Sequence, residues 1–116
     1  NFQINIESRS IYRKQCSYFN ILFLYMQHAN SKNSKIIFEI LARVIKQERE
    51  KQNKSLRLFA DEFDIQKSLL SRIENGVNEP KLISLWTISE ALGIPISQLL
   101  KKVEKELPKD FSLIEK

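Results

Sequence analysis

The clearest pattern of apolar and polar positions lies in residues 55–76, SLRLFADEFDIQKSLLSRIENG. In its first half the apolar residues at helical spacing are Phe59, Ala60 and Phe63. In its second half the inward positions are Leu70 and Ile73, with Ile65 just ahead. We predict a helix over Leu56–Phe63 and a second helix that Gln66 opens, joined by a tight corner.

Three residues mark the ends of these two helices. Ser55 offers a side-chain oxygen that caps free amides of the first helix. Asp64 stands at the corner, where we expect a left-handed backbone conformation that Asp tolerates better than most residues. Gly76 has the position at which helices commonly end. Both helices are therefore predicted to be short and sharply bounded.

Apolar spacing predicts three further helices. The first is capped by Ser34, runs to about Gln52, stops at Asn53 and has apolar residues at Ile37, Phe38, Leu41, Val44 and Ile45. Another follows the loop 77–81, ends at Gly93 and contains Leu82, Leu85, Trp86, Ile88, Ser89 and Leu92. The last follows Pro95 and has a buried stripe of Ile96, Leu99, Leu100 and Val103. The predicted fold class is all-α, with five helices.

The polar side of the second short helix carries the candidate chemistry. Its residues are Lys67, Ser68, Ser71 and Arg72. Cationic and hydroxyl groups on a short, well-anchored helix suit the phosphate oxygens and base edges of DNA. Two short helices joined by a corner are also how a small protein presents one helix to a DNA groove.

Residues between Leu41 and Leu100 resemble the Cro/repressor helix-turn-helix family, also called the XRE family of transcriptional regulators. The matching residues are Arg49, Ser55, Phe59, Ala60, Phe63, Ile65, the run from Leu70 to Gly76, Pro80, Leu85, Ala91, Leu92, Gly93, Leu99 and Leu100. Two positions depart from the family pattern. Leu56 stands where a Gln usually touches the sugar-phosphate backbone, and Asp64 stands where Gly is preferred. The resemblance implies a five-helix, repressor-like DNA-binding domain over residues 34–107.

The resemblance also implies which residues face DNA. It places nearest the bases Gln66, Lys67, Ser68 and Arg72, with Leu69 and Ser71 flanking them. In this interpretation Arg72 binds a guanine bidentately, Gln66 binds an adenine and Leu69 touches a thymine methyl. An exposed Lys or Arg is usually just solvated, and Leu69 is equally a fold or dimer contact. The motif favours DNA contact for Lys67 and Arg72.

Residues around the reading helix are expected to contact phosphates, which positions a protein without specifying sequence. These rim candidates are Lys54, Ser55, Arg57, Asn78 and Lys81. The family further implies a partly buried ion pair between Arg49 and Glu74, which joins the long first helix to the reading helix. Loss of one partner of a buried pair costs about 3–5 kcal/mol, against about 0–1 kcal/mol for an exposed pair.

The implied function is sequence-specific binding of double-stranded DNA, in the first place as a transcriptional repressor. Since one such helix reads few base pairs, we expect a homodimer on a pseudo-palindromic operator. The dimer surface is expected on the fifth helix, at Leu99, Leu100, Val103 and Leu107, although the first three also fit inside the core. The alternative is a protein-interaction module such as an antitoxin or adaptor, favoured by apolar residues where surface residues are expected: Leu56, Leu58 and Leu69.

Charge supports DNA binding weakly. The formal net charge is +5 over 116 residues, and the apolar fraction of 42% suits one compact domain. Divided along the chain, the charge is +3 in residues 1–33, +2 in 34–81 and zero in 82–116. The placement of Lys and Arg on one face therefore matters more than their sum.

The sequence predicts neither a catalytic site, a metal site nor a cofactor. Cys16 and His28 are the only residues of their types, so no zinc-type cluster is available. Gly76 and Gly93 build no phosphate-binding loop. A single cysteine excludes an internal disulfide and indicates a reducing compartment, so a cytoplasmic location is expected.

Residues 1–33 are expected to form an N-terminal extension of uncertain structure. The apolar run 18–26 is far shorter than the roughly 20 residues of a membrane helix, and no cleavage pattern of small residues follows it, so neither a membrane partner nor a signal peptide is expected. The run suits a strand or a patch for a partner chain. Because Met26 is the only methionine, a further hypothesis is that translation begins there. Residues 108–116 are expected to be a loose tail.

Overall fold

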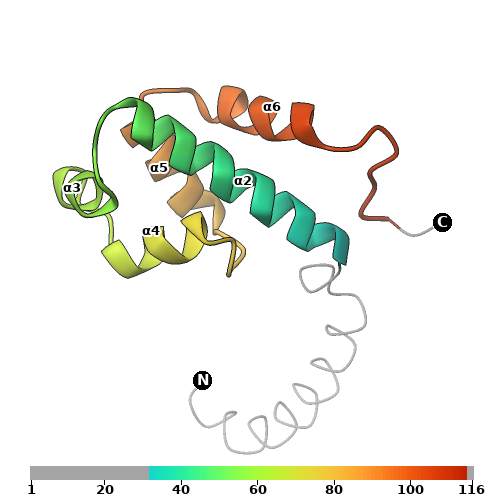
Figure 1. Cartoon of the computed structure of the whole chain (residues 1–116), viewed down its shortest axis with the longest axis horizontal. Coiled ribbons are helices and arrows are strands. Elements are labelled where there is room, and N and C mark those ends of the chain that lie inside the picture. Colours follow the sequence, from blue (N-terminus) through green and yellow to red (C-terminus); the bar gives the residue numbers. More distant parts are fainter. Residues whose placement is uncertain (1–31, 115–116) are drawn as a thin grey trace, which may run out of the picture. The chain divides into compact units, whose positions relative to one another are not determined.

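A computed structural model of the chain describes residues 32–114, which contain five helices (Figure 1). These are α2 (Lys32–Lys51), α3 (Leu56–Glu62), α4 (Lys67–Glu74), α5 (Leu82–Leu92) and α6 (Ile96–Glu106). No strand occurs between residues 32 and 114. The predicted all-α class is confirmed. The expectations for Cys16, the apolar run 18–26, Met26 and His28 concern residues outside this described part.

The longest of the five helices, α2, has α4 along one side and α6 along the other (Figure 1). Its inner face contributes to the core Ile40, Leu41, Ala42, Val44 and Ile45. The predicted stop is confirmed, since Asn53 has a φ of 57° just beyond Lys51. The expected cap at Ser34 is wrong. Ser34 is buried inside α2, whereas a capping residue has a non-helical backbone and precedes the helix.

The two short helices meet as predicted. The Leu58 amide donates to the Ser55 Oγ at 3.1 Å, which caps α3. Asp64 has a φ of 53°, and its left-handed conformation turns the chain sharply toward α4. α3 ends at Glu62, and Phe63 is its C-terminal cap. The rings of Phe59 and Phe63 lie 5.0 Å apart between their centroids and pack this corner.

Glycines in the left-handed conformation close α4 and α5. Gly76 has a φ of 66°, and the Val77 amide donates to the Arg72 carbonyl at 3.1 Å. Gly93 has a φ of 76°, and the Ile94 amide donates to the Ser89 carbonyl at 3.2 Å. Both ends satisfy helix carbonyls that would otherwise lack a donor. A side chain at either glycine would strain the turn.

The buried stripe predicted on α6 is partly wrong. Leu99 and Val103 are buried, while Leu100 is 44% exposed. Leu99 and Val103 are four residues apart and share one face, whereas a single residue step rotates Leu100 by about 100° away from it. The apolar positions of α6 are thus divided between the core and the surface.

Residues 108–114 contain no helix, and their backbone is attached at one point to α2. The Asn33 side-chain amide donates to the Ser112 carbonyl at 2.8 Å. Phe111 and Leu113 are half-buried. The described part of the expected loose tail is therefore held near the beginning of α2.

Among the described helices, no single one is long and apolar enough to cross a membrane. α5 and α6 reach that threshold only when counted together, and they are bent by 100° at their junction. Their most apolar side chains lie in the protein core, with Ile88 and Leu99 fully buried. Core packing accounts for the hydropathy of this pair.

Candidate DNA-binding surface

The reading helix α4 is anchored by its inner side. Leu70 and Ile73 are at most 2% exposed and belong to the same core as the buried residues of α2, α5 and α6. α4 packs against both α2 and α3. An eight-residue helix has little stability of its own, so this packing is what keeps it helical.

An ion pair fixes the orientation of α4 relative to α2. The Arg49 guanidinium donates from Nε to Glu74 Oε2 and from Nη2 to Glu74 Oε1, both at 2.8 Å. The two side chains are 9% and 4% exposed. The remaining Nη1 group donates to the Lys54 carbonyl at 2.7 Å, so Arg49 also holds the segment before α3. A bidentate pair allows little rotation and is therefore suited to setting the angle of a short helix.

The environment of Arg49 favours its charged form. The hydrogen bonds that Arg49 donates to Glu74 raise the pKa of Arg49 above its ordinary value, while burial opposes this shift and the Glu74 charge adds to it. A guanidinium remains charged in proteins under all ordinary conditions. The pair is consequently intact across the physiological pH range as far as Arg49 is concerned.

The outer side of α4 carries the predicted reading residues. Exposed residues on it are Gln66, Lys67, Ser68 and Arg72. Gln66 is the N-cap residue, and its side chain makes no capping hydrogen bond, so the amide remains available. Within residues 32–114, no hydrogen bond or ion pair engages the side chains of Lys67 and Arg72. Two cations without a partner among residues 32–114 therefore project from a helix whose opposite side is packed against the core.

The two flanking residues of α4 are less exposed than the predicted reading residues. Leu69 is half-buried and packs against the core. Ser71 is also half-buried, where the sequence pattern had placed it on the solvated side. Its Oγ and its carbonyl both face the Asn75 side-chain amide, at 3.4 and 2.9 Å. The Asn75 side chain thus holds the Ser71 hydroxyl in place.

The rim candidates differ in how freely they can reach a phosphate. Exposed on the described surface are Ser55, Arg57, Asn78 and Lys81. The Ser55 Oγ already accepts the Leu58 amide, although its hydroxyl proton can still be donated. Within the part of the chain that the structure describes, Arg57 and Lys81 have no ion-pair partner. Lys81 is the N-cap residue of α5, with no side-chain capping bond.

Lys54 is the rim candidate that is already engaged. Its Nζ lies 2.7 Å from Glu62 Oε2 and 5.0 Å from the centroid of the Phe63 ring. Its side chain is 23% exposed. To contact a phosphate, Lys54 must leave a carboxylate and an aromatic face, which costs part of the attraction gained. The sequence did not indicate this pairing, because Lys54 precedes α3 and Glu62 is the last residue of α3, eight positions further along the chain.

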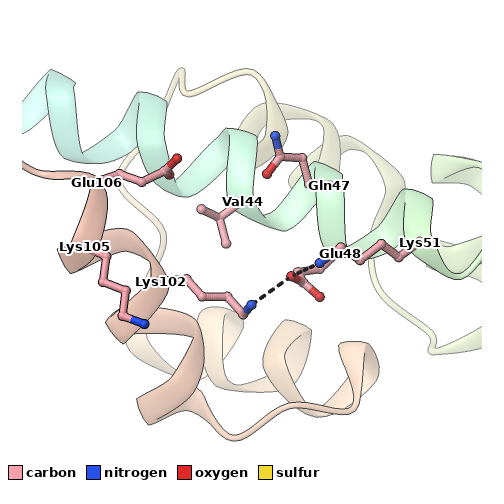
Figure 2. Close-up of a pocket in the computed structure, with 7 residues that line it drawn as sticks. All are labelled: Val44, Gln47, Glu48, Lys51, Lys102, Lys105 and Glu106. Atoms are coloured by element: carbon pink, nitrogen blue, oxygen red, sulfur yellow. Dashed lines mark hydrogen bonds and ion pairs between the residues drawn. The ribbon is translucent and has the colours of Figure 1, made fainter.

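A second basic region lies between α2 and α6, where a cleft of about 290 Å³ opens (Figure 2). It is lined by Val44, Gln47, Glu48, Lys51, Lys102, Lys105 and Glu106. The Nζ atoms of Lys51 and Lys102 lie 3.0 and 3.4 Å from Glu48 Oε1. The hydrogen bond from Lys51 lowers the pKa of Glu48, burial opposes this, and Lys102 adds to the lowering. Two of the three lysines here share one carboxylate.

The described residues offer no group of three or more His, Cys, Asp or Glu side chains placed to hold a metal ion. The chemistry of the outer side of α4 is instead that of a polyanion-binding surface, with exposed cations, an amide and a hydroxyl on a well-anchored helix. Together with the tight corner between α3 and α4, this arrangement defines the helix-turn-helix class of DNA-binding proteins.

Comparison with known proteins agrees with this class. A family model described as Helix-turn-helix matches residues 45–99, which include α3, α4 and α5. Control protein C.MunI of Mycoplasma sp is 40% identical over 58 residues, which are 50% of this chain and 78% of the control protein. The chain belongs to the Cro/repressor (XRE) helix-turn-helix family of DNA-binding transcription regulators. The resemblance found in the sequence is confirmed.

A solved structure shows the same fold. The crystal structure of the clp gene regulator ClgR from C. glutamicum has a TM-score of 0.57 to this chain at 22% sequence identity. The match covers 64% of this chain and 96% of the ClgR chain. At that identity the likeness concerns the arrangement of helices and not their contacts with DNA.

Proposed function

We propose that this protein is a transcriptional repressor that reads a specific double-stranded DNA sequence with α4. The observation that carries the proposal is the contrast between the two sides of α4. Leu70, Ile73 and the Arg49–Glu74 pair fix one side, while Lys67 and Arg72 extend from the other without partners among residues 32–114. A rigid helix with free cations enters the major groove at little entropic cost.

The proposed base contacts follow from side-chain chemistry. Arg72 binds a guanine O6 and N7 bidentately, and Gln66 binds an adenine through its amide. Lys67 and Ser68 contact base edges or phosphates at the N-terminal end of α4. Leu69 and Ser71 have a smaller part, because packing and Asn75 hold them back.

The phosphate contacts are proposed at the rim. Ser55, Arg57, Asn78 and Lys81 are exposed and position the domain without specifying sequence. Lys54 joins them after it leaves Glu62.

We further propose that two copies bind a pseudo-palindromic operator in the cytoplasm, and that bound protein blocks transcription. A single α4 contacts too few base pairs for useful specificity, so two-fold symmetry doubles the sequence that is read. The names of the similar proteins, a control protein and a gene regulator, support a regulatory role. No catalytic step is part of this proposal.

A protein-interaction module on the same scaffold is the second candidate, and one observation favours it. Leu58 is 53% exposed on α3. The other two leucines that suggested such a role, Leu56 and Leu69, pack against the core. A single exposed leucine is a small basis for a protein interface, so DNA binding is the better supported function.

Selection of bound duplexes from a random pool by the full chain tests the proposal. We expect an enriched motif with two inverted half-sites, bound more weakly as salt concentration rises. Enrichment of no sequence, together with binding that is equal for all duplexes, would contradict sequence-specific recognition. Absence of any duplex binding would favour the protein-interaction module.

A further inference from the structure

One side of α6 is rich in lysines and borders two adjoining hollows. The first is the cleft of about 290 Å³ toward α2, and the second has a volume of about 240 Å³. Lys102 and Lys105 line both of them. We call the surface around the two hollows the α6 furrow, and its polar residues are Glu48 and Lys51 of α2 with Gln98, Lys101, Lys102 and Lys105 of α6.

The acidic side chains of the α6 furrow do not balance its lysines. Glu48 Oε1 is shared by the Nζ atoms of Lys51 and Lys102, at 3.0 and 3.4 Å (Figure 2). One carboxylate therefore neutralises one of two cations. Glu106, the other acidic residue that lines the cleft, lies 3.2 Å from Arg43 and is occupied by it. The α6 furrow thus has an excess of positive charge.

Lys101 and Lys105 are the free cations of the α6 furrow. Both are exposed, and within residues 32–114 their side chains have no ion pair or hydrogen bond. They lie one helical turn apart, which places their Cβ atoms about 5–6 Å from each other. Side chains at alternate positions of an extended chain lie on one side, about 6.6 Å apart. Carboxylates at alternate positions of an extended segment therefore match the spacing of these two lysines.

We propose that the α6 furrow binds an extended, acidic segment of a partner protein. The carboxylates of the segment pair with Lys101 and Lys105, and the Gln98 amide is placed beside them for its backbone. The lysine stems cover apolar parts of the segment. Each hollow is below the range of about 300–1,000 Å³ of small-molecule pockets. The α6 furrow therefore suits side-chain ends of a segment that lies across it.

Charge and symmetry disfavour an occupant supplied by this chain. Residues 1–33 carry a net charge of +3, so the α6 furrow repels them as a whole. A second copy would have to bring acidic residues from a different part of its surface. Such a head-to-tail contact forms rings or open chains of copies, and not the two-fold dimer proposed above.

The position of the α6 furrow separates it from the DNA-binding surface. α4 and α6 lie along opposite sides of α2 (Figure 1). On the proposed function, in which α4 reads DNA, the duplex lies away from the α6 furrow. The α6 furrow therefore stays open to a protein while DNA is bound.

Binding of a labelled peptide to the full chain, followed by fluorescence anisotropy, tests the proposal. The probe is a peptide of repeated Glu-Ser units, which has carboxylates at alternate positions, and a Gln-Ser peptide of equal length is its uncharged control. We expect the wild type to bind the Glu-Ser peptide and not the Gln-Ser peptide. The affinity should fall as salt concentration rises.

Two double variants with the same change in net charge locate the binding. Lys101→Gln with Lys105→Gln should raise the dissociation constant at least about fivefold, because both free cations are lost. Lys35→Gln with Lys46→Gln changes exposed lysines of α2 that line neither hollow and should bind as the wild type does. Glutamine favours helices nearly as well as lysine does, so far-UV circular dichroism should be unchanged. If the first variant loses helical signal, Lys105→Gln alone provides the comparison.

Failure of this inference is distinguishable from failure of the proposed function. Lys67→Gln with Arg72→Gln should bind the Glu-Ser peptide as the wild type does and should lose duplex binding. Excess duplex should not displace the peptide from the wild type. If no duplex binds to the wild type, the proposed function fails, while the peptide titrations still decide whether the α6 furrow binds an acidic segment.

Four results would overturn the inference. They are no binding of the Glu-Ser peptide, equal binding of the Gln-Ser peptide, equal losses in the two lysine variants, and loss of peptide binding in the α4 variant alone. A single-stranded RNA bound more tightly than the peptide, and weakened by the change at Lys101 and Lys105, would instead assign the α6 furrow to nucleic acid.

Discussion

Two regions of this molecule carry exposed cations, and they hold them differently. On the outer side of α4, Lys67 and Arg72 have no partner within residues 32–114. In the cleft between α2 and α6, Lys51 and Lys102 share the Glu48 carboxylate (Figure 2), and nearby Arg43 lies 3.2 Å from Glu106. A cation that is already paired gains less free energy from contact with a phosphate. Whether the cations are paired therefore distinguishes a DNA-binding surface from an ordinary charged surface better than net charge does.

The largest expected effect concerns the ion pair that holds α4 in place. Arg49→Ala leaves Glu74 buried and without its partner, so the free energy of unfolding should fall by about 3–5 kcal/mol. Urea denaturation measures this loss. Arg43→Ala removes the exposed partner of Glu106 and should cost about 0–1 kcal/mol. Equal losses in the two variants would show that burial of the Arg49–Glu74 pair has no energetic consequence.

The next effect distinguishes the two cationic regions directly. Arg72→Ala should lose about 1–3 kcal/mol of discrimination at one base position in each half-site, because the proposed bidentate contact to guanine can no longer form. Selection from a random duplex pool should then return the wild-type motif with that position relaxed. Lys102→Ala, in the cleft, should return the complete motif. A motif altered by Lys102→Ala and unchanged by Arg72→Ala would reverse the roles of the two regions.

A smaller effect tests whether pairing withholds a cation from DNA. Glu62→Gln removes the carboxylate that holds Lys54. If Lys54 then reaches a phosphate, the slope of log affinity against log salt should become steeper by about 0.9. Glu106→Gln makes the same change in net charge far from α4 and should leave the slope unchanged. Identical slopes for both variants and the wild type would show that Glu62 does not withhold Lys54 from DNA.

The smallest effect lies in the cleft and depends on pH. Because its lysine partners lower the pKa of Glu48, the ionised group stabilises the fold above the ordinary glutamate value of about 4.3. This contribution is lost as the pH falls through the lowered pKa. Glu48→Gln should therefore cost at most about 1 kcal/mol at pH 7 and nothing in strong acid. A difference from the wild type that grows as the pH falls would contradict this sign.

Local signals in the sequence predicted the helix ends well. Ser55, Asp64 and Gly93 act through their own backbone or the next few residues, and the structure confirms each of them. The prediction for Ser34 was wrong because serine, which often caps a helix, is also small enough to be buried inside one. Cap preference alone does not distinguish these two situations.

Contacts between segments that are distant in the sequence were harder to predict. Helical spacing identifies apolar residues but not which of two apolar faces the core will use, so Leu100 was assigned to the buried stripe of its helix although it is exposed. The pairing of Lys54 with Glu62 depends on how the chain turns before α3. The family resemblance implied the Arg49 and Glu74 positions, and the structure adds the bond from Arg49 to the Lys54 carbonyl.

The central claim is that the free cations of α4, and not the paired cations of the cleft, meet the DNA. The salt dependence of operator binding for Lys67→Ala and Lys102→Ala measures this most directly. Loss of one phosphate or base-edge cation should reduce the slope of log affinity against log salt by about 0.9 for Lys67→Ala. The slope should be unchanged for Lys102→Ala. A reduced slope for Lys102→Ala with a wild-type slope for Lys67→Ala would contradict the account.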